Sequence, residues 1–133
     1  MSKIDELKTL ETSFAKKLSA AKIVSTDDLL KRCSNPQSRV TTAAETGIKE
    51  ADLLKWAHIV DMMRIPGVTG PYAELLNAVG VHNIRELRTL NASTLISKLQ
   101  EINDKKHFVK VLPTSTTLQG WIEQARTTEP RVI

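Results

Sequence analysis

A short stretch from Ile65 to Leu76 constrains the fold more than any other part of this 133-residue chain. It begins with an apolar residue, continues through a glycine-containing turn, and ends in a helical pattern. Gly67 supplies the backbone freedom that a sharp turn between two helices needs. Pro71 fits the first position of the following helix, and Gly80 fits the residue just past its end. Four apolar residues share one face of that helix, at i, i+3, i+4 and i+7: Tyr72, Leu75, Leu76 and Val79.

The stretch resembles the helix-hairpin-helix motif, in which the order is hydrophobe-x-Gly-hydrophobe-Gly-x-x-x-Ala-x-x-Leu. The matching residues are Ile65, Gly67, Val68, Ala73 and Leu76. Thr69 stands at the position of the second glycine, and Gly70 follows one residue later. The resemblance implies that backbone N–H groups of the turn contact a nucleic-acid phosphate, as they do in DNA-binding and repair proteins that carry the motif.

A related pattern occurs near the start of the chain, at a constant offset of 58 residues. Residues 7–18 align with residues 65–76, and the register continues without a gap. The paired positions are Leu7 and Ile65, Leu10 and Val68, Phe14 and Tyr72, Ala15 and Ala73, Leu18 and Leu76, Ile23 and Val81, and Leu29 and Leu87. Ser25 and Asn83 also correspond, and each fits a helix N-cap with an acidic residue three positions later. Such an internal repeat predicts two copies of one structural unit.

The first copy lacks both glycines of the turn, because Thr9 and Glu11 occupy those positions. A residue other than glycine costs roughly 1–2 kcal/mol in a left-handed turn, so we expect the first turn to adopt another conformation. Glu11 would also repel a phosphate. The first copy is therefore predicted to be structural.

Caps and apolar spacing predict an all-α fold. Helices are expected from Asn35-Pro36 to Gly47, over 50–63, over 84–90, from Asn91 onward, and after a cap at Ser115 or Thr116. The last of these carries four apolar residues, Leu118, Trp121, Ile122 and Ala125. The tail from Thr127 to Ile133 is expected to be frayed.

We expect one compact unit made of two tandem helix-hairpin-helix copies and a C-terminal closing helix. Its parts are residues 1–48, the degenerate first copy; residues 49–104, the second copy; and residues 105–133, a linker, the closing helix and the tail. The layout resembles a bacterial family of small tandem helix-hairpin-helix proteins of unassigned function, over about residues 4–126. Leu53-Leu54-Lys55-Trp56 and Gly120-Trp121-Ile122 contribute to this resemblance.

The chain has 19 Lys and Arg residues against 15 Asp and Glu, a formal charge of +4. This balance permits binding to nucleic acid without requiring it. A single cysteine, Cys33, excludes an internal disulfide and suits a reducing cytosol. No apolar run approaches the roughly 18 residues of a membrane span, and the first residues lack the hydrophobic region of a signal peptide. The sequence therefore predicts a cytoplasmic protein that makes no contact with membranes.

Nothing in the sequence predicts an enzyme or a cofactor. The three histidines, His58, His82 and His107, are scattered, and no pair has the spacing of metal ligands. His58 precedes Asp61 by three residues, which favours a hydrogen bond on a helix surface. Cys33 has no base placed near it by the sequence. Phosphate-binding Gly-Lys and serine-hydrolase motifs are absent.

Two functions remain open. In the first, the turn binds nucleic-acid backbone without reading sequence, through the N–H groups of Gly67, Val68, Thr69 and Gly70. The basic residues expected to assist are Lys16, Lys17, Arg85 and Arg88, with Lys105, Lys106 and Lys110 as a further cluster. In the second, the unit is a scaffold for protein–protein interaction or assembly. The aromatic residues Trp56, Trp121, Phe14 and Tyr72 are expected in the core in either case. Whether the partner is DNA, RNA or protein stays open, as does the oligomeric state.

Overall fold

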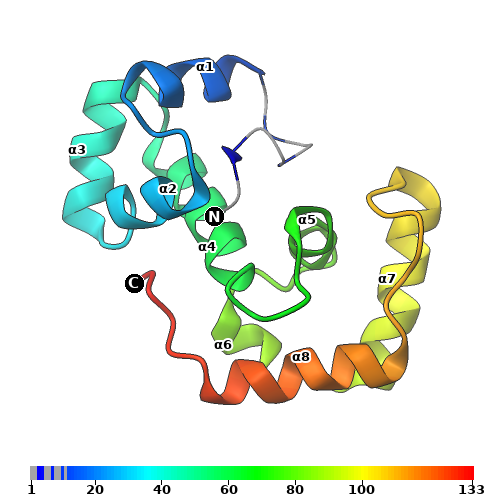
Figure 1. Cartoon of the computed structure of the whole chain (residues 1–133). Coiled ribbons are helices and arrows are strands. Elements are labelled where there is room, and N and C mark those ends of the chain that lie inside the picture. Colours follow the sequence, from blue (N-terminus) through cyan, green and yellow to red (C-terminus); the bar gives the residue numbers. More distant parts are fainter. Residues whose placement is uncertain (1–2, 5–6, 8–9, 11) are drawn as a thin grey trace.

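The protein is a helical assembly, seen here in a computed structural model that describes residues 3–4, 7, 10 and 12–133. Within these residues the chain forms eight α-helices and no strand, which confirms the all-α prediction (Figure 1). Their bounds are α1 Thr12–Ala20, α2 Thr26–Arg32, α3 Pro36–Thr46, α4 Glu50–Met62, α5 Gly70–Ala78, α6 Ile84–Leu87, α7 Ala92–Lys106 and α8 Ser115–Thr127.

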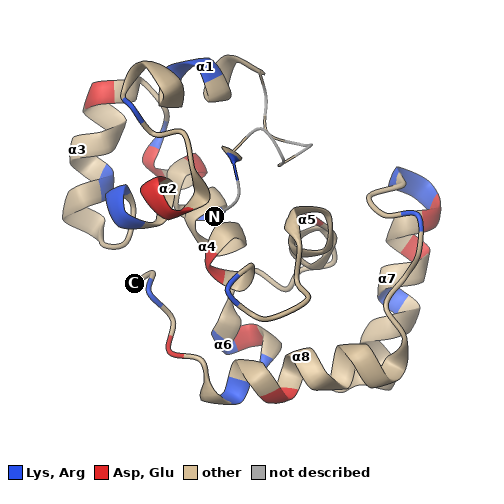
Figure 2. Cartoon of the chain, viewed as in Figure 1, with Lys and Arg blue, Asp and Glu red and all other residues tan. Residues whose placement is uncertain are grey.

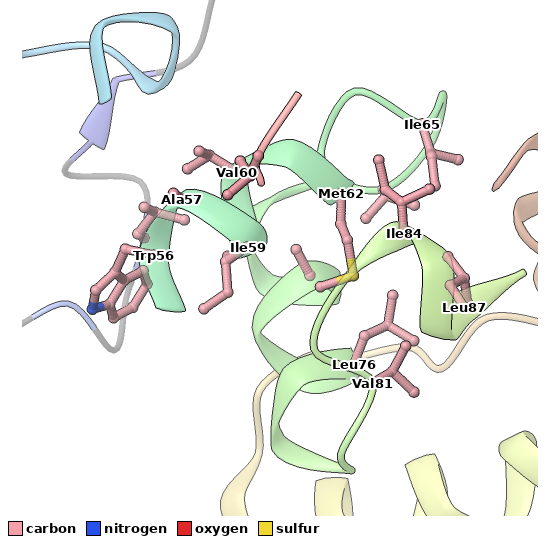
Figure 3. Packing of buried hydrophobic residues seen from close by; sticks show 14 of the residues in the cluster. Trp56, Ala57, Ile59, Val60, Met62, Ile65, Leu76, Val81, Ile84 and Leu87 are labelled. Atoms are coloured by element: carbon pink, nitrogen blue, oxygen red, sulfur yellow. The ribbon is translucent and has the colours of Figure 1, made fainter. Parts of the chain in front are cut away.

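Helix α4 is the central element. It contacts α2 and α3 on one side of the molecule and α5 and α6 on the other. A helix covered in this way is apolar around most of its circumference, and seven consecutive or near-consecutive residues of α4 are buried: Leu53, Trp56, Ala57, Ile59, Val60, Asp61 and Met62. Figure 3 shows the side of α4 that faces α5 and α6, where the Met62 side chain lies among buried residues that include Leu76, Val81 and Ile84. The core therefore runs through both halves without a break.

The backbone makes equivalent hydrogen bonds at positions separated by 58 residues. After α1, the N–H of Ile23 donates to the carbonyl of Leu18 at 2.8 Å, and after α5 the N–H of Val81 donates to Leu76 at 2.9 Å. The N-caps of α2 and α6 correspond too: Asp28 N–H to Ser25 Oγ at 3.0 Å, and Glu86 N–H to Asn83 Oδ1 at 2.9 Å. In both connections, α1 to α2 and α5 to α6, one residue has the left-handed backbone conformation: Lys22 with φ 65° and Gly80 with φ 96°. The first turn, at Thr9 and Glu11, lies outside the described residues.

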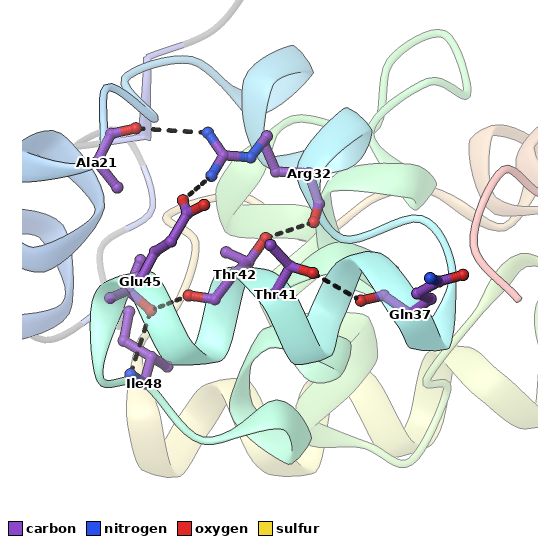
Figure 4. Close-up of polar contacts among 8 residues, drawn as sticks. Ala21, Arg32, Gln37, Thr41, Thr42, Glu45 and Ile48 are labelled. Carbon is purple, nitrogen blue, oxygen red and sulfur yellow. Dashed lines mark hydrogen bonds and ion pairs between the residues drawn. The ribbon is translucent and has the colours of Figure 1, made fainter.

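Polar contacts fix α3 against α2 in the first half (Figure 4). The Thr42 hydroxyl donates to the carbonyl of Arg32 at 2.7 Å, where it satisfies one of the free carbonyls at the end of α2. Arg32 also forms an ion pair with Glu45. At the end of α3, the Thr46 hydroxyl accepts a hydrogen bond from the N–H of Ile48 at 3.2 Å. Gly47 has the left-handed conformation that is typical of a glycine at the end of a helix.

Two sequence predictions about the C-terminal part are wrong. The N-cap of α8 is Thr114, whose hydroxyl accepts the N–H of Thr117 at 3.1 Å, and not Ser115 or Thr116. The tail after α8 is not frayed. It runs back over the molecule (Figure 1), and the side chain of Val132 is fully buried. Helix α6 is also shorter than predicted, since it ends at Leu87.

Candidate functional site

The turn between α4 and α5 is a tight β-turn over residues 65–68. The N–H of Val68 donates to the carbonyl of Ile65 at 3.0 Å, and Gly67 has φ 89°. Proline at the second position and a glycine of positive φ at the third are the signature of a type II turn. Ile65 and Val68 are buried on the two sides of the turn, while Pro66 and Gly67 at its tip are exposed.

Helix α5 begins directly after this turn, with Thr69 as its N-cap and Pro71 in its first turn. Among the described residues, the N–H groups of Gly67, Thr69 and Gly70 have no hydrogen-bond acceptor. Thr69 is exposed, and its side chain makes no capping bond. The N–H of Val68, which was also predicted to be a donor, already closes the turn and is not free. Thr69 and Gly70 lie at the positive end of α5, which is a favourable place for an anion, and Thr69 is the exposed one of the two.

Helix α8 packs against the turn through Trp121. A methyl group on Gly67 would lie 3.0 Å from Nε1 of Trp121, so the turn and the indole ring touch. The rings of Tyr72 and Trp121 are 5.3 Å apart, centroid to centroid, and the Tyr72 hydroxyl donates to the carbonyl of Val111 at 2.7 Å. Trp121 and Trp56 are buried and Tyr72 and Phe14 are partly buried against the core, which confirms the packing role predicted for these aromatic residues.

A groove of about 850 Å³ opens beside the start of α5. One wall is formed by Thr69, Pro71 and Tyr72, and the other by the end of α7 and the connection to α8, with His107 and Lys110 among its residues. Asp104 also lines it. A neighbouring hollow of about 600 Å³ shares His107 and adds Lys55 and Lys106. The basic residues near the turn therefore come from α4, from the last residue of α7 and from the segment that follows it. The sequence marks this segment as basic but does not place it beside residue 69.

The other predicted basic residues are arranged differently (Figure 2). Lys16 and Lys17 are exposed on α1, which packs against α3 and is not brought to the turn. Arg88 donates to the carbonyls of Ala125 at 3.1 Å and Thr128 at 3.0 Å, so its guanidinium group closes the end of α8. Arg85 is exposed on α6. None of these four residues lines the groove beside Thr69.

Burial shifts the pKa of two side chains that the sequence singles out, Cys33 and His58. Burial raises the pKa of the Cys33 thiol to about 11, which keeps it protonated and a poor nucleophile near neutral pH. Burial also disfavours the charged form of His58, and this lowers the pKa of its imidazole group. The expected bond between His58 and Asp61 is not formed: the Asp61 carboxylate instead accepts from Arg64 at 2.7 Å and from the N–H of Arg131 at 3.0 Å. No three described His, Cys, Asp or Glu residues are grouped so that they could hold a metal ion.

No helix in the described residues is both long enough and apolar enough to span a membrane. Comparisons with curated proteins and with solved structures gave no match. The sequence model of one protein family matches residues 8–128, which include every helix and the turn at 65–68. The chain therefore belongs to the family described as a domain of unknown function, DUF4332.

Proposed function

We propose that this protein is a non-enzymatic accessory protein that binds the backbone of nucleic acid, without sequence preference and without a cofactor. In this proposal the α4–turn–α5 unit is a helix-hairpin-helix motif, and the start of α5 receives a phosphate. The observation that carries the proposal is the free N–H group of Thr69, the exposed N-cap of α5, which lines a groove with Lys110 on its far wall.

The physical argument rests on charge and geometry together. Free N–H groups at a helix N-terminus attract an anion through their partial positive charge. Lysines nearby add the sequence-independent attraction that dominates binding to phosphates. Lys110, Lys106 and Lys55 supply it along the groove and the adjoining hollow. The equivalent hydrogen bonds at an offset of 58 residues support the further proposal that residues 1–48 are the first copy of the motif, in degenerate form.

Thr69→Asp is the variant that tests this proposal most sharply. Aspartate is a favoured N-cap, and its charge suits the start of a helix, so stability should be unchanged or slightly higher. The same charge repels a phosphate. Binding of a fluorescently labelled DNA duplex, followed by anisotropy at several salt concentrations, should weaken about tenfold or more. The slope of log affinity against log salt should become shallower by about one phosphate contact. Gly67 is unsuitable for this purpose, because a side chain there would disturb Trp121.

Gln37→Glu is the matched control, since it adds one negative charge at an exposed position in the first turn of α3. It should leave affinity within about twofold of the wild type. A second comparison separates the two sets of lysines: Lys110→Glu should weaken binding strongly and Lys17→Glu weakly. Equal affinity of Thr69→Asp and wild type would remove the turn from the binding site. A stronger effect of Lys17→Glu than of Lys110→Glu would move the site to α1.

The alternative is a protein–protein interaction or assembly module in which the same unit is a scaffold. Two contacts favour it. Gly67 packs against Trp121, and Arg88 donates hydrogen bonds to carbonyl groups at the end of α8. Both give residues of the second copy a structural use that needs no phosphate. The salt titration separates the alternatives, because a scaffold would bind neither duplex nor single strand near 50 mM salt, where counterion release favours phosphate contacts.

A further inference from the structure

Residues 129–133 lie against the end of α4 and the connection between α2 and α3, in a place that we call the tail groove because it encloses the side chain of Val132. After α8 ends at Thr127, residues 129–133 run back across α4 toward the connection between α2 and α3 (Figure 1). Val132 is fully buried, whereas Glu129, Arg131 and Ile133 are exposed. One side chain of the segment is therefore inserted, and its neighbours point outward.

The groove holds this segment through its backbone. Four hydrogen bonds do so: Arg64 Nη1 to the carbonyl of Glu129 at 2.9 Å, Arg131 N–H to Asp61 Oδ2 at 3.0 Å, Ile133 N–H to the carbonyl of Ser34 at 2.9 Å, and Arg39 Nη2 to the carbonyl of Ile133 at 2.6 Å. None of the four uses a side chain of residues 129–133. Binding of an extended segment through its main chain, with one pocket for a side chain, is a recurring mode of peptide recognition.

The groove contains charged groups that need such a segment. Asp61 is 1% exposed and Arg39 is 6% exposed. Asp61 has Arg64 as its other partner, and Arg39 also donates to the carbonyl of Cys33 at 2.8 Å. Removing the segment would leave one Asp61 oxygen and one Arg39 nitrogen without their present partners, and only water could replace them. The side chains of Asp61 and Arg39 therefore favour a bound segment that offers a backbone N–H and a backbone carbonyl group.

We propose that this groove is a peptide-binding site for an extended segment with an aliphatic residue at the position of Val132. Residues 129–133 fill it within the same chain, and the same segment of a second copy is the partner that fits it between chains. Exchange of an identical element between two copies needs no new contacts. The recognition elements are Ser34, Arg39, Asp61 and Arg64, which lie apart from the groove beside Thr69.

The test uses the full chain with Val132→Asp, which places a charge in the apolar pocket and frees the groove. The probe is a fluorescein-labelled peptide with the sequence of residues 128–133, Thr-Glu-Pro-Arg-Val-Ile, amidated so that its last residue presents a carbonyl group. We expect the variant to bind this peptide at least about tenfold more tightly than wild type, whose own segment competes at a high effective concentration. The same peptide with aspartate in place of valine is the control and should not bind.

The proposal would be overturned if the folded Val132→Asp chain did not bind the peptide, or if the variant and the wild type bound it equally. A circular dichroism spectrum shows whether the variant is folded. If it is not, hydrogen exchange of the wild-type chain decides. The N–H groups of Arg131 and Ile133 should exchange at least about tenfold more slowly than in the free peptide, because each is hydrogen-bonded in the groove. Exchange at the rate of the free peptide would show that the groove does not hold the segment.

Discussion

Lys22 is the residue where the first half of the chain meets a conformational cost that the second half avoids. It lies at the end of α1 with φ 65°, and the equivalent position after α5 is Gly80 with φ 96°. A side chain in the left-handed region costs about 1 kcal/mol, whereas glycine adopts it freely. Lys22→Gly should therefore raise the free energy of unfolding by about 0.5–1 kcal/mol, measured by urea denaturation.

The control for this prediction is Lys22→Ala, which removes the same charge but keeps the β-carbon. It should give no comparable gain, because the backbone cost remains. An equal increase in both variants would assign the effect to the lost charge and leave the backbone explanation without support. Lys22 is exposed, so neither substitution removes a packed side chain.

The contact between the turn and α8 is the feature that matters most at the scale of elements. Gly67→Ala and Gly80→Ala make a matched pair, since both glycines have positive φ and both substitutions add one methyl group. At Gly80 the methyl group meets open space, but at Gly67 it lies 3.0 Å from Nε1 of Trp121. Both variants should lose about 1 kcal/mol from backbone strain, and Gly67→Ala should lose about 1 kcal/mol more from crowding.

Thermal or urea denaturation of the two variants measures this difference, and Trp121 fluorescence should change only in Gly67→Ala. Equal costs would mean that α8 yields to the added methyl group and does not fix the turn. A stabilising Gly67→Ala would contradict the left-handed geometry itself.

Elements built from local signals could be predicted, whereas contacts between distant segments could not. An N-cap residue bonds to backbone groups within three residues of itself, so a helix start can be predicted from local sequence. Helices α3, α6 and α7 begin after the predicted caps Asn35, Asn83 and Asn91. The turn at 65–68 was predictable for the same reason. The groove beside Thr69 depends on the path of residues 103–111, and the docked tail depends on backbone groups that carry no side-chain pattern. The spacing of apolar residues along the sequence predicts neither the groove beside Thr69 nor the position of the tail.

At the scale of the whole molecule, α4 joins the two halves into one structure. It contacts α2 and α3 as well as α5 and α6, and the segment after α8 crosses it to reach Arg39. The halves share buried surface, so neither has a complete core without the other. Small proteins with one continuous core unfold in a single cooperative transition. The chain should therefore unfold as one unit, even though its hydrogen bonds recur at an offset of 58 residues.

Leu29→Ala and Leu87→Ala test this cooperativity at equivalent positions, one in each half, and both leucines are fully buried. Each substitution should lower the free energy of unfolding by about 2–5 kcal/mol, because each leaves a cavity. In a single unit, both substitutions reduce hydrogen-exchange protection in α2 and in α7 alike, and circular dichroism and tryptophan fluorescence report one midpoint. If Leu29→Ala loosened α2 while α7 kept the protection of the wild type, the halves would fold separately. The shared helix α4 makes the first outcome the expected one, since a cavity on either side of it weakens the element on which both halves pack.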